Sequence, residues 1–366
     1  AIQKECQASG VKATLVAANM DDEASMDAAL AGATHSFCVT NWWELFFANG
    51  AVPGVEGFVA GKKAQEIEEA QGYRWVDLCK KHGLEFVVYS GLCDAEKLSN
   101  GKHKNIYHFQ GKAKIEQYMW DNLRGCSARA GCYMENFTGM IKPQPDGTLA
   151  FPIGDSRGLP MISIAEYGGS VAGVFKEGAE AWAGKVCNVV SEYVTGSYFC
   201  ETLSKAIGKP VTFFPCTVEV YAGFGFPGDA ELAEMFNMFT MNYVTDEDIA
   251  TAKRLHPAGK FPTLEEYFTA NKELVTYEEA PKVGGKICTV FGATGAQGGS
   301  VARYLAKSGL FVELRLVTRD VTKEAAIAIQ KECQASGVKA TLVAANMDDA
   351  SSMDAALAGA THSFCV

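Results

Sequence analysis

The sequence predicts an α/β fold with a doubly wound parallel sheet, and three features of the 366 residues support this. Short apolar, β-branched runs alternate with segments of helical spacing, a pattern that requires right-handed crossovers between parallel strands. A glycine-rich turn joins one of these strands to a helix. Residues 1–39 recur as 328–366, each number 327 higher, with differences only at positions 23 and 24.

The internal repeat predicts an unusual order of elements. One complete domain is obtained only when residues 284–366 are placed before residues 40–271. No continuous segment of the chain contains all the elements of that domain in this order. We expect a fragment of a longer tandem array, and a stand-alone permuted protein is the alternative. The two differences between the copies favour natural sister copies over a cloning artefact.

The elements follow in order from residue 284. Strands are predicted at 286–291, 311–318, 340–345 and 362–366, and helices at 300–308, 323–336 and 351–357. The N-terminal end repeats the later part of this series, with a strand at 13–18, a helix at 22–31 and a strand at 35–40. Asp21 or Asp22 can cap that helix. The series continues with a helix at 61–82, a strand at 84–90, a helix at 112–122 and a strand at 127–131.

Beyond about residue 149 the pattern is less regular. Short strands are expected within 185–194 and 210–219, with helices at 198–207, at 230–241 and after Thr263. The chain is therefore predicted to hold four parts. They are a Rossmann-type domain lacking its first two strands at 1–148, a smaller α/β substrate-side lobe at 149–271, a linker at 272–285 and the first half of the next Rossmann copy at 286–366.

Composition and charge exclude several classes of protein. A net charge of −10 argues against a nucleic-acid-binding surface, and no apolar run has the length of a membrane helix. The twelve cysteines form no CxxC pair, and several lie in apolar, strand-like runs. We expect reduced, buried thiols in a cytoplasmic protein. No metal-ligand spacing is present, so no metal is predicted.

The glycine motif is the strongest chemical signal. Gly292, Gly295 and Gly298 are spaced three apart between a predicted strand and helix, as GxxGxxG rather than GxGxxG. Small residues let the backbone approach a pyrophosphate, which then faces the positive end of the helix. The residues assigned to this site are Gly292, Thr294, Gly295, Ala296, Gln297 and Gly298. A bare tight turn is the alternative interpretation.

Arg319 follows the second strand of this series, where a dinucleotide fold contacts the adenosine ribose. A carboxylate there would pair with a free 2′-hydroxyl, whereas an arginine suits a 2′-phosphate. NADP(H) is therefore predicted in preference to NAD(H). Arg315 is less well placed, inside the strand, and a solvated strand-end arginine is the alternative for Arg319.

The chain resembles the NmrA-like family of atypical short-chain dehydrogenases, and within it the NADPH-sensing redox sensors. The matching stretches are VFGATGAQGGSVAR at 290–303, VTNWWE at 39–44, FVVYSGL at 86–92, HFQGK at 108–112, CYMEN at 132–136 and GFPG at 225–228. The resemblance implies a Rossmann domain with a small α/β lobe. It also implies that the turn of Asn19, Met20 and Asp21, with its twin at 346–348, lies at the adenine side, and that Thr40 and Asn41 lie near the nicotinamide.

The resemblance further implies that Lys112 holds the nicotinamide ribose, and that Tyr133, Glu135 and Asn136 close over the cofactor. Short-chain dehydrogenases use a tyrosine four residues before this lysine as proton donor, and here that position is His108. Lys112 and His108 are the candidate catalytic residues, since the lysine can lower a neighbour's pKa and the histidine could carry a proton. The alternative is that His108 is a surface or loop residue.

Three functions follow from these observations. The missing tyrosine favours an NADP(H)-responsive redox sensor or scaffold with little or no dehydrogenase activity. The second is an NADP(H)-dependent reductase of a small carbonyl, quinone or enone. The third is a structural tandem array with a vestigial nucleotide site. Residues 1–39 duplicate 328–366, so the domain at 1–148 lacks only its first two strands. We expect residues 284–327 to dock there as these two strands, either on their own chain or head to tail on a neighbouring chain.

Overall fold

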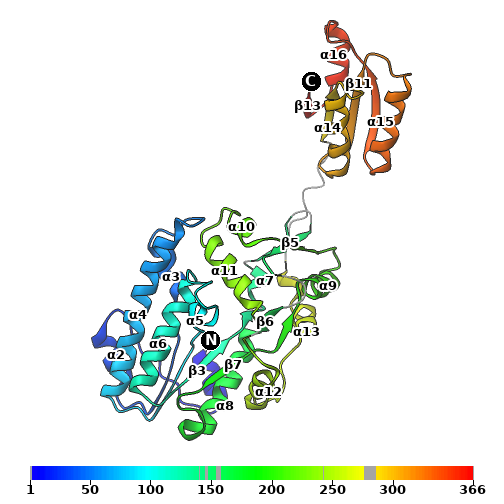
Figure 1. Ribbon diagram of the computed structural model, residues 1–366. Helices are drawn as coiled ribbons and strands as arrows, with labels where there is room; N and C mark the ends of the chain where they lie inside the picture. The colour runs from blue at the N-terminus through cyan, green and yellow to red at the C-terminus, as the bar shows by residue number, and fades with distance from the viewer. Residues whose placement is uncertain are drawn as a thin grey trace. The chain divides into compact units, whose positions relative to one another are not determined.

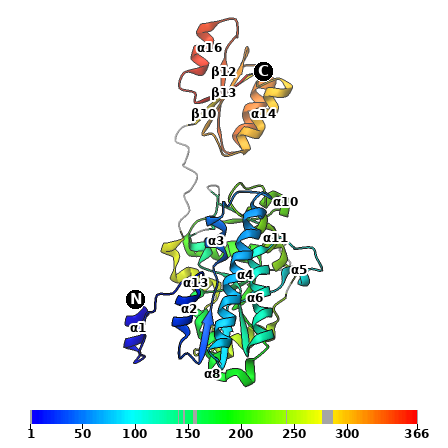
Figure 2. The ribbon, with the colours of Figure 1, turned by 90° about the vertical axis from the view of Figure 1, so that its left-hand side faces the viewer.

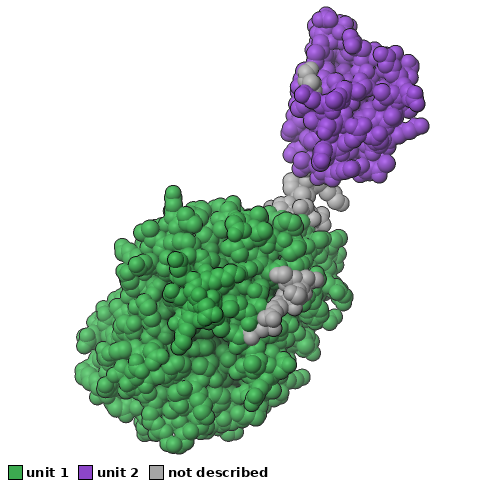
Figure 3. Space-filling view, viewed as in Figure 1, with its two compact units in different colours: residues 1–277 green, residues 278–366 purple. Residues whose placement is uncertain are grey.

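The computed structural model describes residues 2–139, 141–144, 147–153, 158–241, 243–275 and 286–365. The chain divides into two compact units, residues 1–277 and 278–366, coloured separately in Figure 3. Each unit has its own sheet and its own core. Within the described residues, no helix has both the length and the apolar character to cross a membrane.

The main sheet of unit 1 is parallel and has the strand order β1-β2-β3-β7. Its strands are β1 (His35–Cys38), β2 (Phe86–Tyr89), β3 (Gly125–Ala130) and β7 (Val186–Val189). Helices cover both of its faces (Figure 1). One face carries α2 (Glu23–Leu30), α4 (Gly57–Lys81) and α6 (Tyr107–Asn122), and Figure 2 views unit 1 from their side. The other face carries α8 (Ile164–Trp182) and α12 (Asp246–Leu255).

β2 shows why this sheet needs two helical layers. All four of its residues are buried, and successive side chains point to opposite faces. Val87 and Tyr89 pack into the core beneath α4 and α6, while Phe86 and Val88 pack into the core beneath α8. A continuous apolar strand is therefore stable only between two layers.

The remaining elements of unit 1 build a smaller lobe around an aromatic core that includes Phe137, Phe151, Phe199, Phe236 and Phe268. Its strands are β4 (Cys132–Tyr133), β6 (Leu159–Ile162) and β8 (Glu192–Val194) in one sheet, and β5 (Thr148–Phe151) with β9 (Thr212–Pro215) in another. Its helices are α5 (Ala95–Leu98), α7 (Asn136–Gly139), α9 (Gly196–Ile207), α10 (Val218–Tyr221), α11 (Asp229–Phe239), α13 (Leu264–Ala270) and the 3₁₀ helix η1 (Lys272–Leu274). Two further helices are α1 (Ile2–Ala8) and α3 (Trp42–Ala48).

The sheet does not follow the predicted boundary at residue 148. β7, α8 and α12 lie within 149–271 and yet build the main sheet and its second layer. The chain leaves this sheet after β3, forms part of the lobe, and returns through the crossover helix α8. At the predicted linker, η1 is followed by the buried Val275 of unit 1, and 276–285 lie outside the described residues.

Unit 2 contains a parallel sheet in the order β12-β11-β10-β13. Its elements are β10 (Ile287–Phe291), α14 (Ala296–Lys307), β11 (Glu313–Thr318), α15 (Glu324–Ala335), β12 (Lys339–Ala344), α16 (Ala350–Leu357) and β13 (His362–Phe364). The predicted α/β architecture with parallel sheets is thus confirmed in both units. The permuted or tandem origin of this order stays a proposal.

One predicted strand is wrong. Residues 13–18 form no strand in unit 1, although their twins at 340–345 largely fall within β12. Leu15 is 75% exposed, whereas its twin Leu342 is half-buried opposite Leu316 of β11. The two copies have the same sequence here, so the presence of β11 as a partner decides which one becomes a strand.

Candidate functional site

The glycine loop of unit 2 brings the start of α14 close to the end of β10. Gly292 has a φ of 66°, a left-handed conformation that favours glycine. A Cβ on Gly298 would lie 2.2 Å from the carbonyl oxygen of Gly292 and 2.9 Å from that of Phe291. Any side chain at Gly298 would therefore push the helix away from the strand.

This loop forms the wall of a cavity of about 600 Å³. The first N–H groups of α14 have no partner within the helix, and the helix dipole makes this end positive. The cavity is lined by Phe291, Gly292, Thr294, Gly295, Ala296, Gln297, Gly298, Val317, Thr318, Arg319, Ala345, Asn346, Met347 and Asp348. It thus brings together all of the predicted glycine-loop residues and Arg319. The sequence assignment omitted Phe291, Val317, Thr318 and Ala345, which end neighbouring strands or follow them.

The two arginines of β11 and its following turn differ in their contacts. Arg315 donates to the carbonyl oxygens of Ala356 (3.2 Å) and Ala358 (2.5 Å), and pairs with Glu313 at 3.3 Å. Its guanidinium is therefore fixed within unit 2. Arg319 is exposed and has no hydrogen-bond or ion-pair partner among the residues that the structure describes. Its guanidinium remains available to an anion in the cavity.

The turn at Asn19 and Met20 lies in unit 1, not in this cavity, where its twin 346–347 is found. In unit 1 the turn is held against α4. Arg74 donates to the carbonyl oxygen of Met20, and Gln71 donates to Asp21 at 2.9 Å. Asp22 caps α2 by accepting from the N–H of Ala24 at 3.1 Å.

Lys112 of α6 is held in a buried polar network of unit 1. Its Nζ donates to Glu68 Oε1 at 2.6 Å and to the carbonyl oxygen and hydroxyl of Thr40 at 2.7 and 2.9 Å. The Thr40 hydroxyl also donates to Glu68 at 2.7 Å and shares a hydrogen bond with Tyr89 at 2.8 Å. The side chain of Glu68 is fully buried and that of Lys112 is 12% exposed. The network ties α4 and α6 to the ends of β1 and β2.

Tyr89 is the tyrosine hydroxyl in this network, one hydrogen bond from Thr40. It is fully buried, and burial raises its pKa well above 10. Tyr89 therefore stays protonated and cannot touch a substrate in this position. It does not replace the tyrosine that short-chain dehydrogenases have four residues before the lysine.

The structure corrects the interpretation of His108 as a surface or loop residue. His108 lies in the first turn of α6 and is 6% exposed. Its Nδ1 is 2.7 Å from Glu231 Oε1, and its backbone N–H donates to the same oxygen at 3.0 Å. The rings of Trp42 and Trp43 lie 5.5 and 5.4 Å away. Glu231 was missed because it is 123 residues further along the chain, on α11.

The other predicted cofactor residues of unit 1 lie at the ends of strands and helices or in the turns between them. Asn41 caps α3 by accepting from the N–H of Glu44 at 3.4 Å. Glu135 accepts from the Ser163 hydroxyl at 2.7 Å and from the N–H of Ile164 at 2.9 Å, at the start of α8. Tyr133 ends β4, and burial raises its pKa. Asn136 begins α7.

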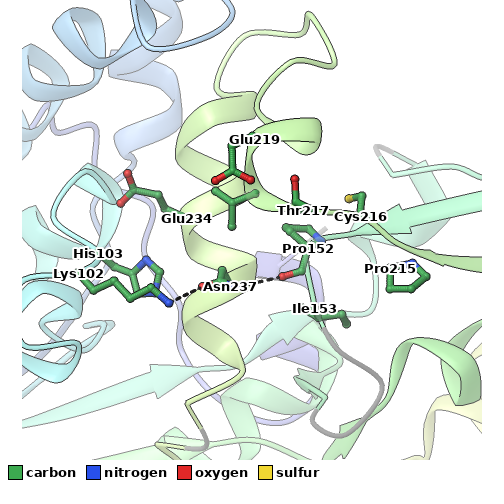
Figure 4. Close-up of a pocket in the computed structure, with 11 residues that line it drawn as sticks. Lys102, His103, Pro152, Ile153, Pro215, Cys216, Thr217, Glu219, Glu234 and Asn237 are labelled. Atoms are coloured by element: carbon green, nitrogen blue, oxygen red, sulfur yellow. Dashed lines mark hydrogen bonds between the residues drawn. The ribbon is translucent and has the colours of Figure 1, made fainter.

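A second cavity, of about 570 Å³, lies in the lobe of unit 1 and was not predicted (Figure 4). Lys102 donates to Asn237 at 3.3 Å, and Asn237 donates to the carbonyl oxygen of Pro152 at 3.4 Å. His103 is 3% exposed, and its Nε2 has no partner among the described residues. Burial, and then the charge of Lys102, lowers the pKa of His103.

Comparison with known proteins identifies the family. The chain matches the NmrA-like family over residues 2–268 and 285–366. The chain belongs to the NmrA-like family. This confirms the resemblance carried by the glycine loop and the motifs of unit 1.

Individual relatives are distant. The nitrogen metabolite repression protein nmr of Neurospora crassa is 28% identical over 47% of this chain and 38% of its own length. The NmrA-like family domain-containing oxidoreductase hkm9 of Aspergillus hancockii is 26% identical over 51% of this chain and 59% of its own. The matched regions thus span less than two thirds of either relative.

Solved structures show the same fold. The crystal structure of NmrA, a negative transcriptional regulator, in complex with NADP has a TM-score of 0.55 and 19% identity, and covers 74% of this chain and 83% of that chain. The same regulator in complex with NAD gives 0.55 and 20%, with the same coverage. NmrA therefore binds both nucleotides.

Proposed function

We propose that the chain is an NADP(H)-binding NmrA-like protein that acts as a redox sensor or scaffold. One observation carries this: the free guanidinium of Arg319 and the open N-terminus of α14 meet in one cavity of unit 2. The helix end suits a pyrophosphate and the guanidinium suits an additional phosphate. The NADP and NAD complexes of NmrA support a nucleotide in this fold.

We also propose that the protein has little or no dehydrogenase activity, because the described residues of unit 1 include no suitable proton donor beside Lys112. The tyrosine expected before Lys112 is absent, Tyr89 is buried, and Lys112 is engaged by Glu68 and Thr40. No side chain of this set offers an accessible proton donor of the usual kind. A protein that binds the nucleotide without consuming it can report the cellular NADPH/NADP⁺ ratio.

Calorimetry with NADP⁺, NADPH and NAD⁺ tests the nucleotide assignment. Wild-type protein is expected to bind NADP⁺ more tightly than NAD⁺. Arg319→Ala removes a charged contact worth about 1.5–3 kcal/mol, so NADP⁺ affinity should fall roughly 10- to 150-fold. Its affinity for NAD⁺, which lacks the 2′-phosphate, should change little.

Arg303→Ala is the matched control, because Arg303 is an exposed arginine of the same unit that pairs with Glu332 outside the cavity. It should leave both affinities unchanged. Equal losses for NADP⁺ and NAD⁺ in Arg319→Ala would contradict the assigned role of Arg319. Absence of binding by the wild type would favour the third function, an array with a vestigial site.

A reductase of a small carbonyl, quinone or enone is the second candidate, and the contact between His108 and Glu231 favours it. The carboxylate fixes Nδ1, and Nε2 has no partner among the described residues, so Nε2 could pass a proton. NADPH oxidation followed with a panel of quinones and enals tests this. Turnover that disappears in His108→Phe would support the reductase, whereas no turnover by the wild type supports the sensor.

The predicted head-to-tail association and the tandem origin of the chain remain proposals. Each unit holds only part of the predicted contacts.

A further inference from the structure

Strand β1 of unit 1 has one free edge. It pairs with β2, and no strand among the described residues pairs with its other side. Phe37 is 43% exposed and Val39 is 56% exposed. An open, apolar strand edge is a site at which another chain can add a strand.

The second copy of the same residues shows what covers this edge. β13 repeats the start of β1, and its edge is paired with β10 in parallel. The register places Cys288 opposite His362, and Val290 opposite Phe364. Phe364 is half-buried and packs against the core of unit 2, unlike its exposed twin Phe37. The partner that fits the edge of β1 is therefore β10.

We propose that β10 of one chain pairs with β1 of a second chain, in the place and register of β13. Because the repeated residues are identical, Cys288 of one chain then lies opposite His35 of the other, and Val290 lies opposite Phe37. The order β12-β11-β10 of one chain continues into β1-β2-β3-β7 of the next. The contact is heterologous, so it links chains head to tail.

The exchange point follows from helix α15. The repeat begins at residue 328, inside α15. If only the residues before 328 docked on the second chain, α15 would be divided between two chains and broken. The turn at 346–349 is a suitable point, since its twin at 19–22 has the same sequence. Residues 286–345 would therefore dock as one piece, which ends 18 residues beyond the segment 284–327 predicted from the sequence.

β13 is the more weakly held of the two copies. Among described residues, α16 contributes one buried side chain, Ala356, and β13 contributes none. The corresponding α2 and β1 bury Leu30 and Cys38, whereas each strand is paired on one side, β1 with β2 and β13 with β10. Pairing with β1 therefore replaces the loosely packed β13 with a strand that buries one of its side chains.

The proposed pairing completes the cofactor site. Carboxyl ends of neighbouring parallel strands meet at one edge of a sheet, where nucleotides bind. The glycine loop after β10 of one chain would lie beside Thr40 after β1 of the other, and Thr40 contacts Lys112. This consequence rests on the proposed function, whereas the strand pairing itself does not.

Disulfide trapping in the full chain tests the pairing. Paired residues on parallel strands are about 4.8 Å apart, which a disulfide can span. His35→Cys places a thiol opposite Cys288 of a second chain, and His362→Cys places it opposite Cys288 of the same chain. After mild oxidation, His35→Cys should give covalent dimers and larger species on non-reducing gels, joined by a 35–288 peptide. His362→Cys should give a linked monomer.

A His35→Cys protein that stays unlinked, while His362→Cys links internally, would overturn the proposal. A 35–288 link found only within monomers would overturn it as well. Repeating the oxidation with NADP⁺ should raise the yield of dimers several-fold if the cofactor site is shared. Dimers without NADP⁺ binding by calorimetry would support the pairing and reject the proposed function.

Discussion

Lys112 and Glu68 form a buried ion pair, and buried pairs are costly to break. Replacing Lys112 with Met would leave the fully buried carboxylate of Glu68 without its cation. We expect the free energy of unfolding of unit 1 to fall by about 3 kcal/mol. All five tryptophans of the chain lie in unit 1, so urea unfolding followed by tryptophan fluorescence reports on this unit alone.

The matched control is Lys205→Met, which breaks a pair with Glu201 whose side chains are 60% and 63% exposed. Solvent screens such exposed pairs, so the free energy of unfolding should change far less than in Lys112→Met. A loss of similar size in both variants would show that the Lys112 network does not stabilise the unit.

The lowered pKa of His103 predicts the sign of a pH dependence in the stability of unit 1. Its pKa in the folded chain is lowered from 6.5 by burial and by Lys102, so the unfolded chain binds the proton first as pH falls. The contribution of neutral His103 to the stability of unit 1 is complete above pH 6.5. It is lost as the pH falls through the lowered pKa of His103 in the folded chain. In His103→Gln, urea unfolding at pH 7.5 and 5.5 should show a smaller loss of stability than in the wild type. His35→Gln, at an exposed histidine of the same unit, should keep the wild-type loss.

Gly298 is expected to be essential for the nucleotide cavity. The methyl group of Gly298→Ala would lie against the carbonyl oxygens of Gly292 and Phe291, so α14 must move. Calorimetry should detect no NADP⁺ binding. Gly168→Ala in α8, where a Cβ meets nothing within 4 Å, should bind as the wild type does.

Residues close together in sequence were predictable, and those brought together by the fold were not. The glycine spacing and Arg319 follow from a strand, a turn and a helix, and these residues line one cavity. The contact of His108 with Glu231, and that of Lys112 with Glu68, joins different elements of unit 1. Their spacing in the chain carries no signal of contact.

At the scale of elements, helix starts that carry a local cap were predictable, whereas the uncapped α4, α6 and α14 begin four or five residues before the predicted starts. Thr263 forms a capping box with Glu266 on α13, and Asp22 caps α2, because these hydrogen bonds are local. The strand predicted at 13–18 failed because a strand needs a partner. Side-chain patterns alone therefore identify a segment able to form a strand, not one that does.

At the scale of the whole molecule, sequence order also misled the domain boundary. β7 returns to the main sheet after the chain has entered the lobe, since parallel strands require long crossovers. The parallel α/β architecture of both units, by contrast, follows directly from the alternation of strands and helices.

Self-association predicts that the stability of unit 1 depends on protein concentration. Association through β1 stabilises the folded form by mass action, so the midpoint of thermal unfolding should rise when the concentration is raised 100-fold. Phe37→Asp places a charge on the edge that β10 would cover and should make the midpoint independent of concentration. A wild-type midpoint that does not change would contradict the association.

The two copies at 12–17 and 339–344 give the molecule an internal reference. The same amino acids are irregular in unit 1 and form β12 in unit 2, so their intrinsic amide exchange rates with deuterated water are equal. The sequence differences at positions 23 and 24 give peptides spanning each copy distinct masses. The ratio of their deuterium uptake rates therefore measures how far one adjacent strand and its packing protect a backbone, with side-chain chemistry held constant.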